Sequence, residues 1–276
     1  MNDFKKADIR TKVQAKLKND LNLFYTEAFL NYAGKPIDSE EPYTEVIADE
    51  LINNYNLVSQ IGKNTPIRKK SFNANHNGVA NVKARIKRFG YLEYNEKLLA
   101  IALFNSKQDD CPSKIFDYEV PIKEKQTDKY GKIDLVSTDT INQSVKLIEL
   151  KIMAKNGKDE TLLRALLEVY TYYKLIRNSF DKFLEDYEDY GLSSDKYKRF
   201  QPAILTDEQS LSGITLSNIK EHPRIQALIS KMNNEIGSKV EGFVYDYPNR
   251  NKPFQSNGEF KQKILLQGDI TITQII

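Results

Sequence analysis

The chain has 276 residues and a hydrophobic fraction of 40%, enough for a sizeable core in one large domain or two small ones. Its formal net charge is only +3, so any surface for nucleic acid must come from an uneven distribution of charge. The single cysteine, Cys111, excludes an intrachain disulfide framework and a cysteine-based zinc site. With no signal-peptide pattern and no uncharged run long enough for a membrane span, we expect a soluble cytoplasmic protein that does not bind membranes.

Apolar residues recur at helical spacing near the N-terminus and predict a long amphipathic helix over residues 9–32. They are Ile9, Val13, Leu17, Leu21, Phe24 and Ala28. Gly34 and Pro36 end this helix, and Pro42 opens a second helix predicted over residues 43–55. We interpret both as a scaffold within a helical, basic N-terminal region that we assign to residues 1–90.

The stretch from residue 51 to residue 92 contains no acidic residue and has a net charge near +8. A surface that contacts the phosphate backbone needs lysine and arginine without base-specific geometry. The alternative is a solvated face that repels other copies of the chain. Our candidate contacts to nucleic acid are Arg68, Lys69, Lys70, Lys83, Arg85, Lys87 and Arg88.

A further helix is predicted over residues 91–105, and it carries Glu93 and Glu96. It leads into a strand predicted over residues 115–122. Two more runs of strand composition follow, over residues 132–137 and 145–152. The polar segment that joins them is short enough for adjacent antiparallel strands.

Alternate side chains of a strand share one face, so Glu149 and Lys151 point the same way while Leu150 turns into the core. If Asp134 lies beside them, two carboxylates and an ammonium converge. With the backbone carbonyl of Leu150, the two carboxylates offer hard oxygen ligands for Mg²⁺ or Mn²⁺. Such a metal polarises a scissile phosphate and acidifies a water, which Lys151 can orient.

This arrangement resembles the PD-(D/E)xK nuclease superfamily, whose signature is an acid on one strand and (D/E)-x-K on the next. Asp134 matches the first acid, and Glu149-Leu150-Lys151 matches the tripeptide, although Ile133 replaces the proline that precedes the acid in the family. The resemblance implies an α/β (α+β) fold with a restriction-endonuclease-like core over residues 91–206, a central mixed β-sheet flanked by helices. Residues 207–276 then form a C-terminal α/β extension packed on this core.

In the superfamily, the helix before the first strand often supplies an additional glutamate near the metal. The resemblance therefore implies that Glu96 joins the metal ligands Asp134, Glu149 and the Leu150 carbonyl. Glu93 and the earlier Glu45 are alternatives. A surface helix also carries such glutamates routinely, without any role at a metal.

A helix predicted over residues 160–178 carries Glu160, Arg164, Glu168 and Tyr172 at four-residue intervals, which places them in one stripe. The pair Glu168 and Tyr172 resembles the Gln-x-x-x-Tyr of RecB-like nucleases, with Glu in place of Gln. Arg164, Glu168 and Tyr172 are therefore candidate supporting residues. Glu168 either orients substrate or forms an i,i+4 ion pair with Arg164.

The acidic and aromatic residues 180–190 predict a short helix or a lid-like segment, and residues 201–206 predict a strand that completes the core sheet. A helix follows over residues 223–236, and strands are predicted within 239–247 and 261–276. His222 lies far in sequence from any cysteine or histidine partner, so we assign it no metal.

The predicted function is hydrolysis of phosphodiester bonds with Mg²⁺ or Mn²⁺ as cofactor and DNA as the first candidate substrate. A homodimer is compatible with this function. The alternatives are a non-catalytic nucleic-acid-binding protein and a protein-interaction module related to phage or defence. Both endonuclease and exonuclease action, on DNA or on RNA, are compatible with these residues.

Overall fold

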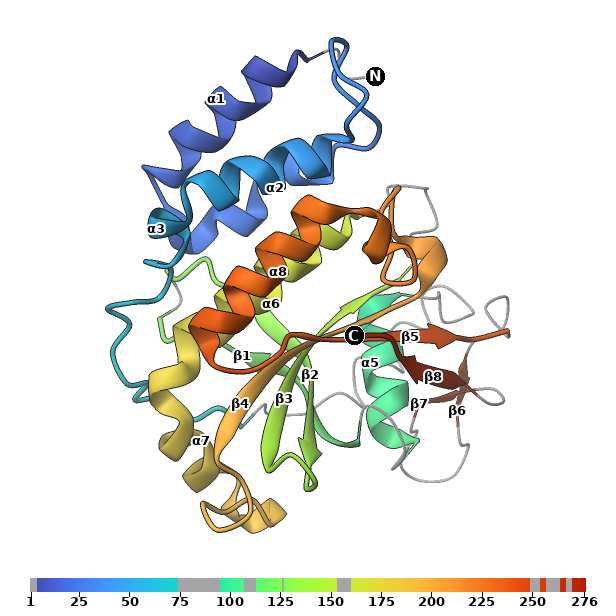
Figure 1. The fold of residues 1–276 in the computed structure, drawn as a ribbon. Helices are drawn as coiled ribbons and strands as arrows, with labels where there is room; N and C mark the ends of the chain where they lie inside the picture. Colours follow the sequence, from blue (N-terminus) through green and yellow to red (C-terminus); the bar gives the residue numbers. More distant parts are fainter. Residues whose placement is uncertain are drawn as a thin grey trace.

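A six-stranded sheet with the order β1-β2-β3-β4-β5-β8 lies at the centre of the protein (Figure 1). Its strands are β1 (Lys114–Pro121), β2 (Lys132–Asp139), β3 (Ser144–Lys151), β4 (Arg199–Thr206), β5 (Glu241–Asp246) and β8 (Thr271–Gln274). A separate antiparallel pair is formed by β6 (Phe254–Ser256) and β7 (Ile264–Leu266). The computed structural model describes residues 4–73, 95–106, 113–125, 127–152, 160–248, 254–256, 264–266 and 270–276.

The central sheet is mixed. The pairs β1 with β2, β2 with β3 and β5 with β8 are antiparallel, while β3, β4 and β5 run parallel. Parallel neighbours require a crossover, and a helix lies between each of these pairs in the chain. The α/β fold class and the antiparallel hairpin of β2 and β3 are thus confirmed.

Helices cover both faces of the sheet (Figure 1). The longer ones are α1 (Lys6–Leu17), α2 (Tyr43–Asn53), α5 (Glu96–Asn105), α6 (Leu162–Ile176), α7 (Phe180–Asp186) and α8 (Pro223–Ile236). The short ones are η1 (Leu21–Thr26), η2 (Ala28–Asn31), α3 (Tyr55–Val58), η3 (Arg177–Ser179), η4 (Glu188–Tyr190), η5 (Glu208–Ser210) and η6 (Ile219–Glu221).

Two apolar cores follow from this layering. Leu147 of β3 belongs to the larger core, which includes α6, α8 and the N-terminal helices. Ile148 and Leu150 face the opposite side of β3 and join a second core with α5. The alternation along β3 therefore decides which side chains meet α6 and which meet α5.

The helix predicted over residues 9–32 is wrong beyond Leu17, where α1 ends and two 3₁₀ helices take over. Asn19 and Asp20 lie at the break, and such short polar side chains compete with the backbone for hydrogen bonds. The backbone N–H of Asn19 bonds the carbonyl of Lys16, three residues back, at 3.1 Å. The apolar residues keep nearly helical spacing because a 3₁₀ helix has a similar period.

Other boundaries shift by a few residues. The second helix ends at Asn53, α6 starts at Leu162 rather than at Glu160, and α8 spans the predicted residues. Helix α5 begins after Asn95, whose side chain accepts the N–H of Leu98. Residues 91–94, the start of the predicted helix, lie outside the described residues. Strands β5 and β8 of the predicted C-terminal extension join the central sheet. Among the described residues, no helix is long and apolar enough to cross a membrane.

Candidate active site

The site lies where β2 and β3 part. Their pairing runs as far as Leu135 and Ile148, so the next position on each strand places Asp134 opposite Glu149. Beyond it, the Asp134 Oδ2 atom accepts the backbone N–H of Leu150 at 2.9 Å. The structure thereby brings Asp134 beside the Glu149-Leu150-Lys151 segment.

Glu149 and Lys151 share the face of β3 that is turned toward α6, while Leu150 is buried against α5. The Lys151 Nζ atom lies 2.6 Å from Glu149 Oε1. The Lys151 side chain is only 7% exposed and the Glu149 side chain only 3%. The two therefore form a buried ion pair and not an exposed one on a strand edge.

Helix α6 supplies the opposite wall, and its start is fixed by Thr161, whose hydroxyl accepts the N–H of Arg164. Glu168 lies on this helix with one oxygen 3.1 Å from Lys151 Nζ. Its other oxygen accepts the Tyr172 hydroxyl at 2.7 Å. The stripe predicted on this helix therefore faces the catalytic candidates.

Arg164 pairs with Glu160 at 3.6 Å, while the two oxygens of Glu168 bond Lys151 and Tyr172, so the alternative of an ion pair between Arg164 and Glu168 is not the arrangement found. Glu168 is directed to Lys151 instead, because the buried ammonium lies on its side of the helix. Glu160 also reaches Lys151, at 2.8 Å. Lys151 is thus shared by three carboxylates.

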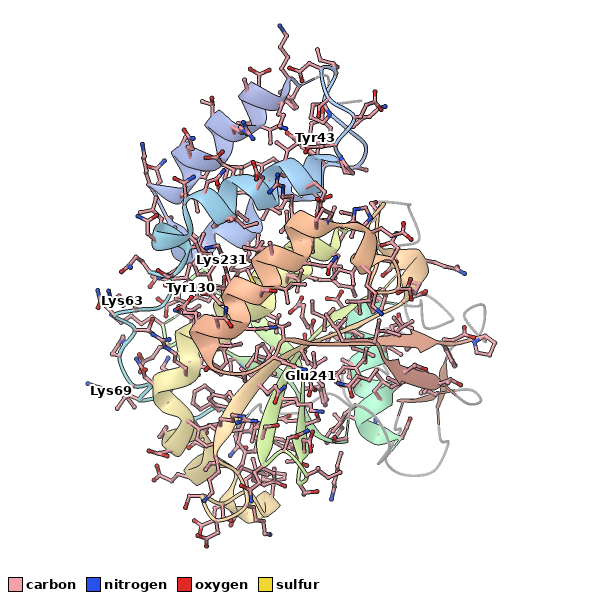
Figure 2. The ribbon with its side chains drawn as sticks, viewed as in Figure 1. Tyr43, Lys63, Lys69, Tyr130, Lys231 and Glu241 are labelled. Carbon is pink, nitrogen blue, oxygen red and sulfur yellow. The ribbon has the colours of Figure 1, made fainter. Side chains whose placement is uncertain are left out.

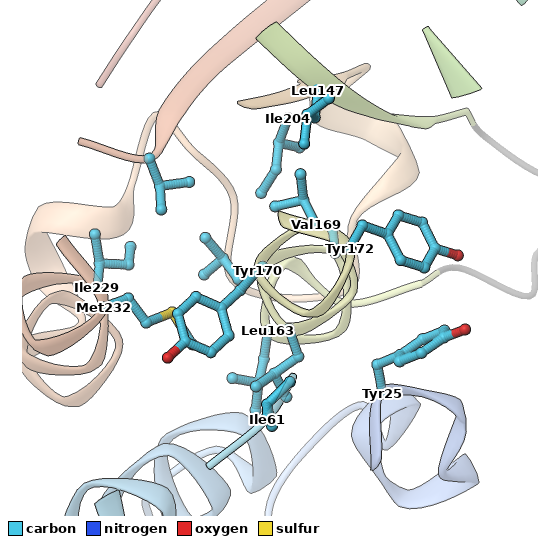
Figure 3. Close-up of a cluster of buried hydrophobic side chains, with 14 of the residues drawn as sticks. Tyr25, Ile61, Leu147, Leu163, Val169, Tyr170, Tyr172, Ile204, Ile229 and Met232 are labelled. Atoms are coloured by element: carbon cyan, nitrogen blue, oxygen red, sulfur yellow. The ribbon is translucent and has the colours of Figure 1, made fainter. Parts of the chain in front are cut away.

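A tyrosine from the N-terminal region completes this wall. Tyr25 of η1 packs edge-on against Tyr172 with ring centroids 5.4 Å apart, and Figure 3 shows the two rings side by side. The Tyr25 hydroxyl accepts the N–H of Gly131 at 3.3 Å. A Cβ atom at Gly131 would lie 2.2 Å from the Tyr172 hydroxyl oxygen, so only glycine allows this approach.

The acids repel one another. Burial raises the pKa of Asp134 well above its ordinary value, and Glu96 raises it further. Burial likewise raises the pKa of Glu149, with Asp134 and Glu168 adding to the rise. Burial lowers the pKa of Lys151, but the surrounding carboxylates outweigh it and leave that pKa well above its ordinary value. One ammonium does not neutralise the cluster, so a further cation would stabilise the ionised acids.

Glu96 is the first residue of α5 and lies close enough to Asp134 to raise its pKa. Burial raises the pKa of Glu96 itself to about 7, against the influence of Lys151. The structure therefore brings Glu96 to the site. Glu93, one of the alternatives, lies outside the described residues.

Glu45, the other alternative, is engaged elsewhere. It is buried on α2, and its oxygens accept the backbone N–H groups of Arg224 and Ile225 at 3.1 and 3.2 Å. These groups open α8, where a carboxylate satisfies free donors and favours the helix dipole. Glu45 therefore caps α8, and its proposed place at the metal is wrong.

The donor chemistry fits a hard divalent cation. The Oε2 atom of Glu149 is buried and has no hydrogen-bond partner among the described residues. The Leu150 carbonyl points to the side of Asp134, because the N–H and C=O of one strand residue face the same neighbour. Within the described part of the chain, no three His, Cys, Asp or Glu side chains form a metal cluster by themselves. A metal here would thus depend on the backbone carbonyl and on water as additional ligands.

Arg68 was predicted to contact nucleic acid, and this is wrong. Its guanidinium is buried and donates to four backbone carbonyls, and it stacks on Phe72 at 4.7 Å. Lys69 and Lys70 are exposed and lie next to it. The other predicted contacts lie outside the described residues: Lys83, Arg85, Lys87 and Arg88.

Two site residues were missed from sequence. Glu160 belonged to the predicted stripe, and its four-residue spacing from Arg164 was a usable signal. Tyr25 gave no signal, because it lies 106 residues from its partner Gly131. Comparison of the chain with protein-family models, curated proteins and solved structures found no match.

Proposed function

We propose that the protein is a metal-dependent nuclease that hydrolyses phosphodiester bonds, with DNA as the first candidate substrate. The observation that carries this proposal is the convergence of Asp134, Glu149 and Lys151 where β2 and β3 part. Two carboxylates can hold a divalent metal that activates water, and a lysine ammonium beside them can offset charge in the transition state, so the arrangement suits metal-assisted phosphodiester hydrolysis.

Asp134, Glu149 and the Leu150 carbonyl would hold Mg²⁺ or Mn²⁺, with Glu96 nearby. The chemistry supplied there is polarisation of the scissile phosphate and acidification of a water. Lys151 orients the nucleophile and offsets negative charge that grows in the transition state. Glu168 and Tyr172 position Lys151 through their hydrogen bonds.

The test is cleavage of linear, circular and branched DNA, and of RNA, by the purified protein with Mg²⁺ or Mn²⁺, each compared with EDTA. We expect products with either metal and none with EDTA. Circular DNA separates the two modes of action, since only an endonuclease opens it. No cleavage of any of these substrates with either metal would contradict the proposal.

The second candidate is a nucleic-acid-binding protein without catalysis. It is favoured by the absence, among the described residues, of a metal cluster made of side chains alone. In that case the three carboxylates around Lys151 serve only to hold the ammonium. Salt-dependent binding to DNA without cleavage would support this candidate.

A further inference from the structure

A pocket of about 410 Å³ opens beside the start of β2. Its walls come from η1, from the segment after α3, from the connection between β1 and β2, and from the last turn of α6. The lining residues that matter most are Asn22, Gly62, Lys63, Lys125, Tyr130 and Leu175. Pockets of about 300–1,000 Å³ are typical of sites for small ligands.

Hydrogen bonds between distant segments form this pocket. The Asn22 side chain accepts the N–H of Gly62 at 3.0 Å and donates to the Tyr130 hydroxyl at 3.4 Å. Gly62 has a φ of +62°, and a Cβ atom there would lie 2.4 Å from the backbone oxygen of Lys174. Gly62 thus lets the loop pack directly on α6, and contacts within the protein hold this wall of the pocket in place.

The rim of the pocket is cationic. Lys63 and Lys125 are exposed, and neither ammonium lies within 4.0 Å of a described carboxylate, although the backbone N–H and the charge of Lys125 both lower the pKa of Asp128. The two acids of the lining are engaged by backbone N–H groups: Asp128 by residues 124 and 125, and Glu124 by Lys69. Four further exposed lysines lie within two residues of the lining in sequence: Lys69, Lys70, Lys123 and Lys129. Lys63, Lys69 and Tyr130 lie on the same side of the molecule (Figure 2).

Helix α6 connects this pocket to the candidate active site. Glu168 contacts Lys151, and Ile176, eight residues further on, lines the pocket. At 1.5 Å per residue the separation along the helix is about 12 Å. Neighbouring nucleotides of one strand could therefore occupy the pocket and the candidate active site together.

We propose that the pocket binds one unpaired nucleotide of a nucleic-acid strand whose scissile phosphate lies at Asp134 and Glu149. The inference rests on the proposed nuclease function. Tyr130 offers a half-buried ring on which a base can stack, and aromatic stacking of unpaired bases is tolerant of sequence. Lys63 and Lys125 offer the charge for the adjoining phosphate. A paired base cannot enter without leaving its duplex, so the pocket selects an unpaired end or a single strand.

The experiment measures binding in EDTA, where cleavage does not interfere. The probes are a blunt duplex and the same duplex with a five-nucleotide thymidine extension, each labelled with a fluorophore for anisotropy. Wild type should prefer the extended probe. Tyr130→Ala should weaken binding of the extended probe by about 5- to 150-fold, the range for loss of one base stack, and leave blunt binding nearly unchanged.

Lys63→Gln combined with Lys125→Gln tests the phosphate contact. Plots of log affinity against log salt should flatten by roughly 1.4 for the extended probe, about 0.7 for each contact to a single strand. The matched control is Lys220→Gln with Lys239→Gln, which removes the same charge from exposed lysines that do not line the pocket. Circular dichroism melting identifies any variant that fails to fold. If Tyr130→Ala unfolds, the variant with Lys63→Gln and Lys125→Gln still tests the pocket, because both lysines are exposed and their loss should not unfold the protein.

Equal affinity of wild type for both probes, or equal salt slopes in the pocket and control variants, would overturn the pocket assignment. Binding of free dTMP without any preference for the extended probe would also overturn it, because the pocket would then serve free nucleotides. These outcomes leave the nuclease proposal standing if Mg²⁺-dependent cleavage is present. Preference for the extension without cleavage would instead support the pocket and contradict the nuclease.

Discussion

Lys151 is the buried cation on which Glu149, Glu160 and Glu168 converge. Replacing it with alanine removes charge that opposes the growing negative charge of the transition state. We expect the single-turnover cleavage rate to fall by a factor of about 10²–10³, while DNA affinity measured in Ca²⁺ stays nearly the same. An affinity loss with an intact single-turnover rate would make Lys151 a binding residue instead.

The same substitution leaves buried carboxylates without their partner, which typically costs about 3–5 kcal/mol. Stability must therefore be measured beside activity. Lys132→Ala is a suitable control, because Lys132 on β2 is 47% exposed and lies 3.5 Å from Glu119. Such an exposed pair contributes at most about 1 kcal/mol.

Gly131→Ala tests the close approach of Tyr172 to the start of β2. The added Cβ atom would lie 2.2 Å from the Tyr172 hydroxyl oxygen, so Tyr172 must move and lose its bond to Glu168. Misplacement of about 1 Å near a catalytic group can lower the rate by about 10²-fold. In a Tyr172→Phe background the 2.2 Å contact is gone and the nearest ring carbon lies 3.1 Å from the added Cβ, so the clash is reduced and Gly131→Ala should cost less there. Equal rate losses in both backgrounds would contradict this coupling.

Single residues differ in how far the sequence predicts them. Strand alternation alone predicted that Glu149 and Lys151 share a face, because the period of two is independent of the rest of the fold. The role of Arg68 was not predictable, since the carbonyls that hold its guanidinium include those of residues 122 and 123 on a distant segment. Tyr25 was missed for the same reason.

At the scale of elements, Lys146 ties three strands together at the end of the sheet away from Asp134. On β3 it lies 2.9 Å from Asp139 of β2 and 2.9 Å from Glu241 of β5. All three side chains are buried. Lys146→Met should lower the free energy of unfolding by about 3–5 kcal/mol, because two buried carboxylates lose their cation. Urea denaturation measures this change, and a loss below about 1 kcal/mol would contradict the bridge.

Element types were more predictable than element ends. The strands of the central sheet and α8 were predicted from composition and periodicity, whereas β6 was not. The helix predicted over residues 9–32 extended beyond the end of α1 because 3₁₀ turns keep a similar apolar spacing. The start of α6 shifted because Thr161 serves as its N-cap. Caps depend on one local hydrogen bond, which a periodic pattern does not contain.

For the whole molecule, the sheet order places the parting of β2 and β3 between α6 and α5, with Tyr25 of the N-terminal region against α6 (Figures 1 and 3). Neither the strand order nor the packing of residues 4–73 on α6 follows from local sequence patterns, because both depend on contacts between segments far apart in the chain. The proposed site therefore draws on the N-terminal region as well as on the core, and this is a property of the complete fold.

The most direct test of the account is Mg²⁺-dependent cleavage of linear duplex DNA by Asp134→Asn and Glu149→Gln. Each substitution keeps the shape of the side chain but removes a charged oxygen ligand. We expect both variants to lose cleavage at saturating Mg²⁺, while the exposed η4 controls Glu188→Gln and Asp189→Asn keep wild-type rates. Unaltered cleavage by folded Asp134→Asn or Glu149→Gln would contradict the assignment of the active site.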